Sequence, residues 1–348
     1  MPCTIIVGGQ YGSEGKGKVT ALTASLLDAP WVVRCGGPNS GHTTRVNGEE
    51  VVLRQLPAAA GHPNALLLLS AGCAVSEDVL LEELDRCRVP PERVVVDPRA
   101  VLVTAEDIKA EQDLAESIGS TASGTGSALA RRLLRGRDVQ LVKDSRRLRG
   151  RARIESVASL LHGHLDVGGH VIVEGTQGFG LSLLHGPDYP HVTARDTTAA
   201  GFAAEVGLSP RQIDGITMVV RTFPIRVGGN SGELANEIEW MEVQKLSGAP
   251  QLWAEYTSVT KRLRRVGTFD LELVKLACRY NRPTQLAVMG ADRLNHANYR
   301  LEEPAELTPD VHKFLEQLHD ELDVPIRWVG TGFGTFEAIR LDAHSLLS

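Results

Sequence analysis

A glycine-rich loop directly after a buried strand limits the possible folds of this chain more than any other feature. The apolar run 4–7 predicts a strand, and the segment Gly9-Gln-Tyr-Gly-Ser-Glu-Gly-Lys-Gly-Lys18 follows it at once. In a strand–loop–helix unit, backbone N–H groups and a helix N-terminus point at one spot, which suits anionic oxygens. The glycines allow close approach of a ligand, and Lys16 or Lys18 can add a positive charge. We therefore expect the loop to bind phosphate.

The spacing within this loop differs from that of a P-loop. Five residues separate Gly9 from Gly15, where a P-loop has four, and Gly17 stands where a Ser or Thr would bind magnesium. A glycine-rich loop is also compatible with a simple tight turn at the surface. The loop alone therefore does not assign a function.

Apolar runs typical of strands alternate with helix-like segments along the chain. The strand-like runs are 31–33, 65–69, 93–96, 170–173, 215–220, 285–288 and 325–329, and the helix-like segments are 76–88, 104–117, 269–280 and 309–322. Continuous apolar strands between helices indicate a largely parallel sheet that is covered on both faces. Residues 45–52 predict a hairpin that turns at Asn47-Gly48. We expect an α/β fold with a large, mostly parallel central sheet flanked by helices, in a single domain over residues 1–348.

Composition and charge disfavour several classes of partner. The chain has 348 residues, of which 42% are hydrophobic and 23% charged, so it can bury a substantial core. Its net charge of -6 argues against nucleic acid or an anionic membrane as the main partner. Its five cysteines occur singly, without the spacing of a zinc site or a disulfide framework: Cys3, Cys35, Cys73, Cys87 and Cys278. With no signal peptide and no apolar run of membrane-spanning length, a cytoplasmic protein is expected.

Several short motifs occur in the same order as in one known family. Gly12-Ser-Glu-Gly-Lys-Gly-Lys18 resembles the Gly-Asp-Glu-Gly-Lys-Gly-Lys signature of adenylosuccinate synthetases. Further segments that resemble this family are Pro38-Asn-Ser-Gly-His-Thr43, Ile118-Gly-Ser-Thr121, Glu174-Gly-Thr-Gln-Gly178, Val192-Thr193 and Thr197-Thr-Ala199. The resemblance runs from about residue 3 to about residue 340, although the chain is shorter than ordinary members.

The resemblance implies a reaction and a set of donor-binding residues. The family joins aspartate to a 6-oxopurine nucleotide, with phosphate first transferred to the purine O6 and then displaced by the aspartate amine. The residues implied to bind the donor nucleotide are Gly12, Ser13, Gly15, Lys16, Gly17, Lys18, Gly41, His42, Thr43, Asp292, Gly330 and Gly332. His42 is implied to be catalytic, together with Ser13, by donating to the transferred phosphoryl group or to O6. The implied cofactor is Mg²⁺, with Ser13 and the backbone carbonyl of Gly41 as ligands.

The resemblance also implies where the two other substrates bind. The purine monophosphate would contact Ser13, Asn39, Ser120, Thr121, Gln177 and Thr193, together with Arg131 of the partner subunit, so a homodimer is implied. L-aspartate would be held by Thr257, Ser258, Val259, Thr260, Arg262 and Arg264, because paired guanidinium groups suit carboxylates. The segment 131–153, which has ten Lys or Arg and two Asp, is also compatible with a solvated helix face and loop.

Ser13 is the main departure from the family pattern. The family has an aspartate here that removes the purine N1 proton, and a neutral hydroxyl is no general base at pH 7 unless a neighbour activates it. The site is therefore either inactive or adapted to another substrate, and a shorter side chain leaves room beside purine C2, where guanine carries an amino group. This pattern resembles the PurZ branch, found in phages that replace adenine by 2-aminoadenine, which joins aspartate to dGMP. The proton acceptor would then be Ser13 aided by water, or a carboxylate of the bound aspartate.

A second departure concerns the donor. Where the family has a Thr-Lys-Leu-Asp element that reads the guanine of GTP, this chain has Val288-Met-Gly-Ala-Asp292, so that Gly290 replaces the lysine whose stem covers the base. ATP or dATP is therefore the expected donor. Together these features favour a ligase that converts dGMP and L-aspartate into N6-succino-2-amino-2′-deoxyadenylate, in the host cytoplasm if the protein is phage-encoded. Two alternatives remain: a conventional synthetase acting on IMP, and a purine-nucleotide sensor without catalysis.

Overall fold

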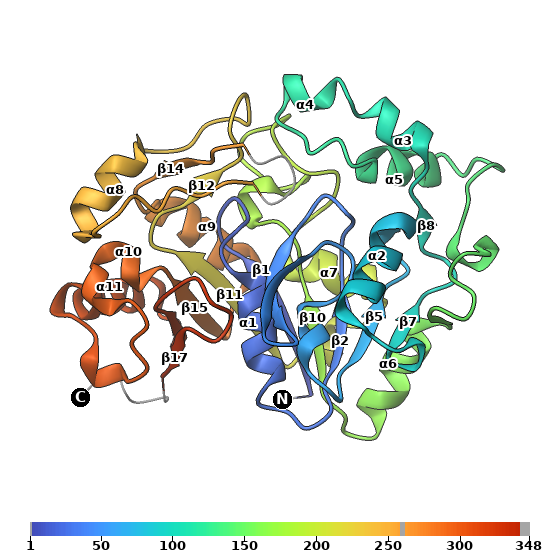
Figure 1. Cartoon of the computed structure of the whole chain (residues 1–348), viewed down its shortest axis with the longest axis horizontal. Helices are drawn as coiled ribbons and strands as arrows, with labels where there is room; N and C mark the ends of the chain where they lie inside the picture. The colour runs from blue at the N-terminus through green and yellow to red at the C-terminus, as the bar shows by residue number, and fades with distance from the viewer. Residues whose placement is uncertain (1, 258–261, 342–348) are drawn as a thin grey trace.

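A ten-stranded sheet runs through the molecule (Figure 1). The computed structural model describes residues 2–257 and 262–341. Neighbouring strands lie in the order β17 (Ala338–Arg340), β16 (Ile326–Gly330), β15 (Gln285–Met289), β11 (Gly215–Arg221), β1 (Cys3–Gly8), β10 (Val171–Glu174), β2 (Trp31–Arg34), β5 (Leu66–Leu69), β7 (Val94–Val96) and β9 (Arg153–Ile154). All neighbours pair in parallel except β17, which runs antiparallel to β16 at one edge. The expected mostly parallel α/β sheet is confirmed.

Helices cover both faces of this sheet. The helices are α1 (Lys16–Ala24), α2 (Glu77–Cys87), α3 (Ala105–Ala110), α4 (Leu114–Ser117), α5 (Thr125–Leu133), α6 (Val157–Asp166), α7 (Ala199–Val206), α8 (Trp240–Ser247), α9 (Leu271–Asn281), α10 (Ala291–Leu294) and α11 (Pro309–Leu322). On one face, Ile5 and Val7 of β1 pack in a core with residues of α6, α7, α9 and α11. On the other face, Ile6 packs with residues of α1 and α2. Burial on both faces explains why the strands are continuous apolar runs.

Most predicted elements are confirmed. The hairpin consists of β3 (His42–Val46) and β4 (Glu49–Leu53), and it turns at Asn47 and Gly48, whose φ angles are 52° and 86°. The predicted helix 104–117 is wrong as a single helix, since α3 and α4 are separate. The reason is Glu111 between them, whose buried carboxylate accepts the backbone N–H groups of Gly124 and Ser127, at 2.7 and 2.9 Å, where α5 begins.

Two further groups of short strands lie outside the main sheet. One is the antiparallel set β12 (Ile225–Arg226), β14 (Arg265–Gly267) and β13 (Glu237–Ile238), and the other is the pair β6 (Ala74–Val75) and β8 (Val101–Leu102). The cysteines are free, as their spacing predicts. Within the described ranges, no helix combines the length and apolar character needed to span a membrane.

The topology brings the sequence motifs to one edge of the sheet. Strand β1 runs directly into the glycine-rich loop, while β2 ends at Arg34, β10 at Glu174, β11 at Arg221 and β15 at Met289. In a parallel sheet all carboxyl ends lie at the same edge, and ligands bind in the crevice outside them. Motifs that are far apart in sequence therefore meet at this edge.

Candidate functional site

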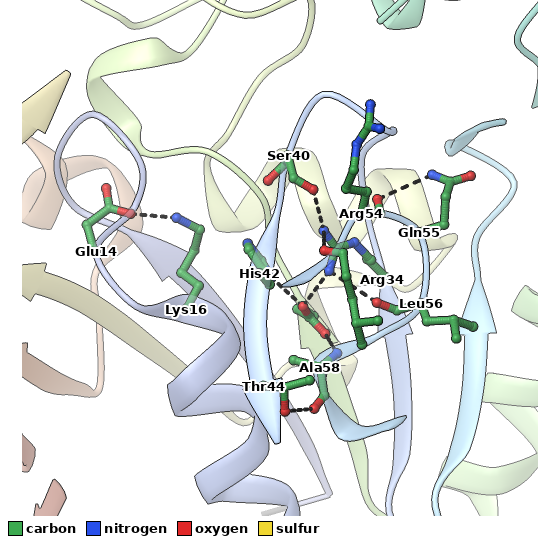
Figure 2. A network of polar contacts seen from close by, with 12 residues as sticks. Glu14, Lys16, Arg34, Ser40, His42, Thr44, Arg54, Gln55, Leu56 and Ala58 are labelled. Atoms are coloured by element: carbon green, nitrogen blue, oxygen red, sulfur yellow. Dashed lines mark hydrogen bonds and ion pairs between the residues drawn. The ribbon is translucent and has the colours of Figure 1, made fainter. Parts of the chain in front are cut away.

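The glycine-rich loop folds around a buried carboxylate. Glu14 is 1% exposed, and its Oε1 accepts the backbone N–H groups of Gln10 at 3.1 Å and Gly12 at 2.8 Å. Its Oε2 lies 2.5 Å from Nζ of Lys16, which is equally buried (Figure 2). The loop then ends at Gly15, which caps α1 with a φ of 105°. Glu14 thus fixes the shape of the loop from inside.

Gly17 has a packing role that explains its departure from the P-loop pattern. A β-carbon added at Gly17 would lie 2.6 Å from Cβ of His42. Helix α1 therefore approaches strand β3 so closely that a Ser or Thr at this position would displace the histidine. The close contact brings the first turn of α1 and His42 together.

A buried carboxylate also orients His42. Glu174 at the end of β10 is fully buried, and it accepts hydrogen bonds from Arg34 Nη1 at 2.9 Å and from the backbone N–H of Ala58 at 2.7 Å. His42 Nδ1 donates to the same carboxylate. Burial opposes ionisation of Glu174, yet Arg34 and His42 hold its pKa below the usual value. Burial and the charge of Arg34 lower the pKa of His42 to about 4, so the imidazole is neutral at pH 7 and offers its Nε2 to a ligand.

Two cavities meet at the glycine-rich loop. The larger has a volume of about 470 Å³ and the smaller about 410 Å³. Within the described part of the chain, the residues that line both are Ser13, Lys16, Gly41, His42 and Arg264. A group bound in one cavity therefore meets a group bound in the other beside these residues, which we call the junction. This arrangement suits the transfer of a group between two ligands.

The larger cavity contains most residues expected to bind the purine monophosphate and the aspartate. Its lining includes Ser13, Asn39, Ser120, Thr121, Gln177, Thr193, Thr257, Arg262 and Arg264. Ser13 and Gln177 have positive φ angles of 58° and 55°. Such conformations are uncommon for residues other than glycine and occur where surrounding structure enforces them, often at functional sites. The expected aspartate-binding residues Ser258, Val259 and Thr260 lie outside the described residues.

The smaller cavity contains most residues expected to bind the donor. Its lining includes Ser13, Gly15, Lys16, Gly17, Lys18, Gly41, His42, Thr43, Asp292 and Gly332. The ammonium of Lys18 donates to the backbone carbonyls of Gly332 and Glu337, and burial lowers its pKa to about 8. Gly330 ends β16 next to this cavity, and its carbonyl accepts the N–H of Gly290 at 3.1 Å. Gly12 lines the larger cavity instead.

Ser13 is held at the junction by arginines. Arg264 Nη1 donates to the Ser13 hydroxyl at 2.6 Å, and Arg221 Nη1 donates to the Ser13 carbonyl at 3.1 Å. Glu255 pairs with Arg221 at 2.5 Å. Burial opposes ionisation of Glu255, but the charges of Arg221 and Arg293 lower its pKa to about 2. The Ser13 side chain thus faces the guanidinium of Arg264, which lies near the ion pair between Arg221 and Glu255.

Arg131 lies outside the linings of both cavities. Its guanidinium binds Asp107 through Nε at 3.2 Å and Nη2 at 2.7 Å, and Nη2 also donates to the carbonyl of Leu102 at 3.0 Å. The single chain therefore does not bring Arg131 to its own expected nucleotide site.

Some residues of the site were not identified from the sequence. Glu174 and Arg34 are paired in register on adjacent parallel strands, so the rule that strand ends share one edge could have found them. Tyr11 and Arg226 carry no such signal. Both line the larger cavity, where the Arg226 guanidinium carbon lies 4.5 Å from the centre of the Tyr11 ring.

The lowered pKa of His42 predicts a pH-dependent contribution to stability. Between about pH 6.5 and pH 4, the unfolded chain binds a proton at His42 and the folded protein does not, so the folded state loses stability as the pH falls. The variant His42→Gln lacks this titration. We expect the free energy of unfolding of the wild type to fall more between pH 7 and pH 5 than that of the variant, by on the order of 1 kcal/mol.

Urea unfolding at both pH values measures this difference. His312→Gln on α11 is the matched control and should follow the wild type. Parallel pH profiles for the wild type and His42→Gln would contradict a neutral, buried His42.

Comparison with known proteins gives consistent matches over nearly the whole chain. The family model for adenylosuccinate synthetase matches residues 5–153 and 140–301. The adenylosuccinate synthetase of Methanocaldococcus jannaschii is 36% identical over 343 residues, covering 95% of this chain and 94% of that protein. That of Archaeoglobus fulgidus is 36% identical over 341 residues, covering 95% and 96%.

Solved structures of this type have the same fold. The fully ligated adenylosuccinate synthetase from Plasmodium falciparum matches with a TM-score of 0.84 and 19% identity, covering 97% of this chain and 99% of that one. The succinoaminodeoxyadenylate synthetase PurZ of cyanophage S-2L, bound to dGMP and to dATP as an energy donor, matches with a TM-score of 0.82 and 28% identity, covering 99% and 97%. The family model and the relatives that match along the chain show that this protein belongs to the adenylosuccinate synthetase family.

Proposed function

We propose that this ligase joins L-aspartate to dGMP at the expense of ATP or dATP and releases N6-succino-2-amino-2′-deoxyadenylate, ADP or dADP, and phosphate. The observation that carries the proposal is Ser13 at the junction of the two cavities, in place of the family aspartate. A serine here replaces the carboxylate that takes the N1 proton in the family by a neutral hydroxyl, which Arg264 holds. The structural likeness to PurZ, which was solved with dGMP and dATP, supports the same assignment.

The junction explains how the acceptor is selected. The Ser13 hydroxyl accepts from Arg264 at 2.6 Å and keeps its own proton to donate, so it can bind an acceptor atom or a water beside the base. A serine side chain is shorter than an aspartate and carries no charge. It therefore leaves room for the 2-amino group that distinguishes guanine from hypoxanthine.

The first chemical step takes place beside His42. The guanine O6 attacks the γ-phosphorus of the donor, the bond to the β-phosphate oxygen breaks, and the N1 proton leaves for water held by Ser13 or for a carboxylate of the bound aspartate. His42 is neutral in the unliganded protein, and anionic phosphate oxygens at the junction favour its imidazolium form. Glu174 stabilises that form, so that Nε2 can donate to the transferred phosphoryl group.

The second step uses the arginines of the larger cavity. Arg262 and Arg264 line this cavity with Thr257, and guanidinium groups bind carboxylates with two parallel hydrogen bonds. An aspartate held there presents its amine to purine C6. The amine attacks C6, phosphate leaves with the C6–O bond electrons, and the amine loses its proton.

The donor cavity, which is the smaller one, favours tolerance of adenine. Gly290 has a φ of 91°, and a β-carbon there would lie 2.7 Å from the Thr222 hydroxyl, so no side chain covers the base from this position. Burial raises the pKa of Asp292.

The residues at the junction fit a magnesium ion. Mg²⁺ prefers oxygen ligands and usually keeps several waters and phosphate oxygens, so it needs few protein ligands. The Ser13 hydroxyl and the Gly41 carbonyl belong to residues that line both cavities and would supply two such oxygens. When bound, the ion would neutralise charge on the donor phosphates.

We also propose a homodimer in which Arg131 of the partner subunit binds the phosphate of dGMP. In the single chain Arg131 is paired with Asp107 and lies outside the cavities, which is compatible with action in the neighbouring site. A second candidate function, synthesis of adenylosuccinate from IMP, is favoured by the 36% identical archaeal relatives that carry that name.

The acceptor assignment predicts that exchange of Ser13 changes substrate choice. Purified protein, aspartate, ATP and magnesium are mixed with dGMP, GMP or IMP, and phosphate release and product mass are followed. The wild type should form a succino adduct of dGMP. Ser13→Asp should shift the ratio of kcat/KM from dGMP toward IMP by at least about tenfold, since it restores a carboxylate beside N1.

Ser13→Ala is the matched control, because it removes the hydroxyl without adding a base. It should lose activity with both acceptors. Exclusive turnover of IMP by the wild type, or unchanged selectivity in Ser13→Asp, would refute the dGMP assignment.

The donor assignment predicts turnover with adenine nucleotides. With dGMP and aspartate held constant, kcat/KM for ATP and dATP should equal or exceed that for GTP, because the position that covers guanine in the family is Gly290. Initial rates with the three triphosphates measure this. Strict dependence on GTP would refute this donor assignment.

A further inference from the structure

A single loop of the donor cavity forms hydrogen bonds with two other elements, the β3–β4 hairpin and helix α1. The loop comprises residues 332–337 between β16 and β17, and we call it the donor loop. From the hairpin, the Glu50 carboxylate accepts the backbone N–H of Thr335 at 2.9 Å and its hydroxyl at 2.6 Å. From α1, Lys18 Nζ donates to the carbonyls of Gly332 at 2.9 Å and Glu337 at 2.6 Å.

The donor loop forms part of the wall of the proposed donor site. Gly332, Phe333 and Thr335 line that cavity together with Asp292. Thr335 is 1% exposed, whereas Phe333 is 50% exposed. The contact with Glu50 therefore reaches a buried residue of the cavity wall.

The hairpin carries this contact directly to His42. Glu50 pairs with Arg45 across the hairpin, and β3 begins at His42, which pairs with Leu53 of β4. Arg45 strengthens the same contact, because its Nε lies 3.2 Å from Glu50 and its guanidinium lies over the ring of Phe336. The paired strands thus connect Glu50 to His42.

We propose that Glu50 is a positioning residue that couples occupancy of the donor-base site to the placement of His42. Lys18 provides a second link, between the donor loop and α1. This inference rests on the proposed function only in taking the smaller cavity as the donor site. A correct base orders the donor loop, the ordered loop holds the hairpin, and the hairpin sets His42 against the transferred phosphoryl group. The identity of the donor base then affects kcat as well as the affinity for the donor.

Amide hydrogen exchange with and without Mg²⁺–ADP tests the coupling independently of turnover. In the wild type, ADP should slow exchange both in residues 332–337 and in residues 44–53 of the hairpin, which lie outside the lining of the donor cavity. In Glu50→Ala, ADP should still protect the donor loop, while protection of the hairpin should be lost. Glu49→Ala is the matched control, because Glu49 is exposed on the same strand and successive side chains point to opposite faces.

Kinetics then separate positioning from simple stabilisation. Glu50→Ala should lower kcat with ATP by about tenfold or more, since small misplacement of a catalytic group has large effects. Its KM for aspartate should stay within about twofold of the wild type. Thr335→Val, which keeps the backbone bond and loses the hydroxyl bond, should have a smaller effect in the same direction.

These outcomes distinguish the coupling from the proposed acceptor. ADP-dependent protection of the hairpin that persists in Glu50→Ala, or failure of ADP to protect the donor loop in the wild type, would overturn the coupling. Absence of a dGMP adduct, together with the expected exchange pattern, would refute the acceptor assignment and leave the coupling supported; kcat is then measured with IMP.

Discussion

The buried carboxylate of Glu174 is the interaction on which the rest of the site depends. Removal of a charged carboxylate from water costs several kcal/mol unless partners satisfy it, so Glu174 requires Arg34, His42 and the backbone N–H of Ala58 together. These partners come from β2, from the start of β3 and from the turn after β4. One buried charge at the end of a central strand therefore fixes three other segments, and through them the ring of His42.

The same principle recurs around both cavities. Glu14 closes the glycine-rich loop with Lys16, and Glu255 neutralises Arg221. Each of these carboxylates at the sheet edge is paired with a cationic side chain. An unpaired carboxylate there would repel a phosphate group. Arg262, which lines the larger cavity, and Arg264, which lines both, are left for an anionic substrate. In the function proposed above, these charges form the frame for phosphoryl transfer, and residue 13 selects the purine.

The sequence predicted the architecture well because that architecture follows from local patterns. The apolar runs became the strands of the central sheet, and the Asn47-Gly48 turn formed as expected, since both depend on neighbouring residues. The segment 104–117 broke into two helices because Glu111 makes hydrogen bonds to α5, a contact that helical periodicity does not register. Most of the motif residues meet in the two cavities, whereas Arg131 does not.

The sequence by itself determined the family, and it located the glycine-rich loop and the departure from the family pattern at Ser13, because these depend on residue types at short, fixed spacings. Only the tertiary structure decided that Glu174 orients His42, that Arg264 holds the Ser13 hydroxyl, and that Glu50 binds the donor loop. These contacts join residues that are distant in sequence. They form only when the parallel sheet brings its strand ends to one edge, and burial there makes each unpaired charge too costly to leave without a partner.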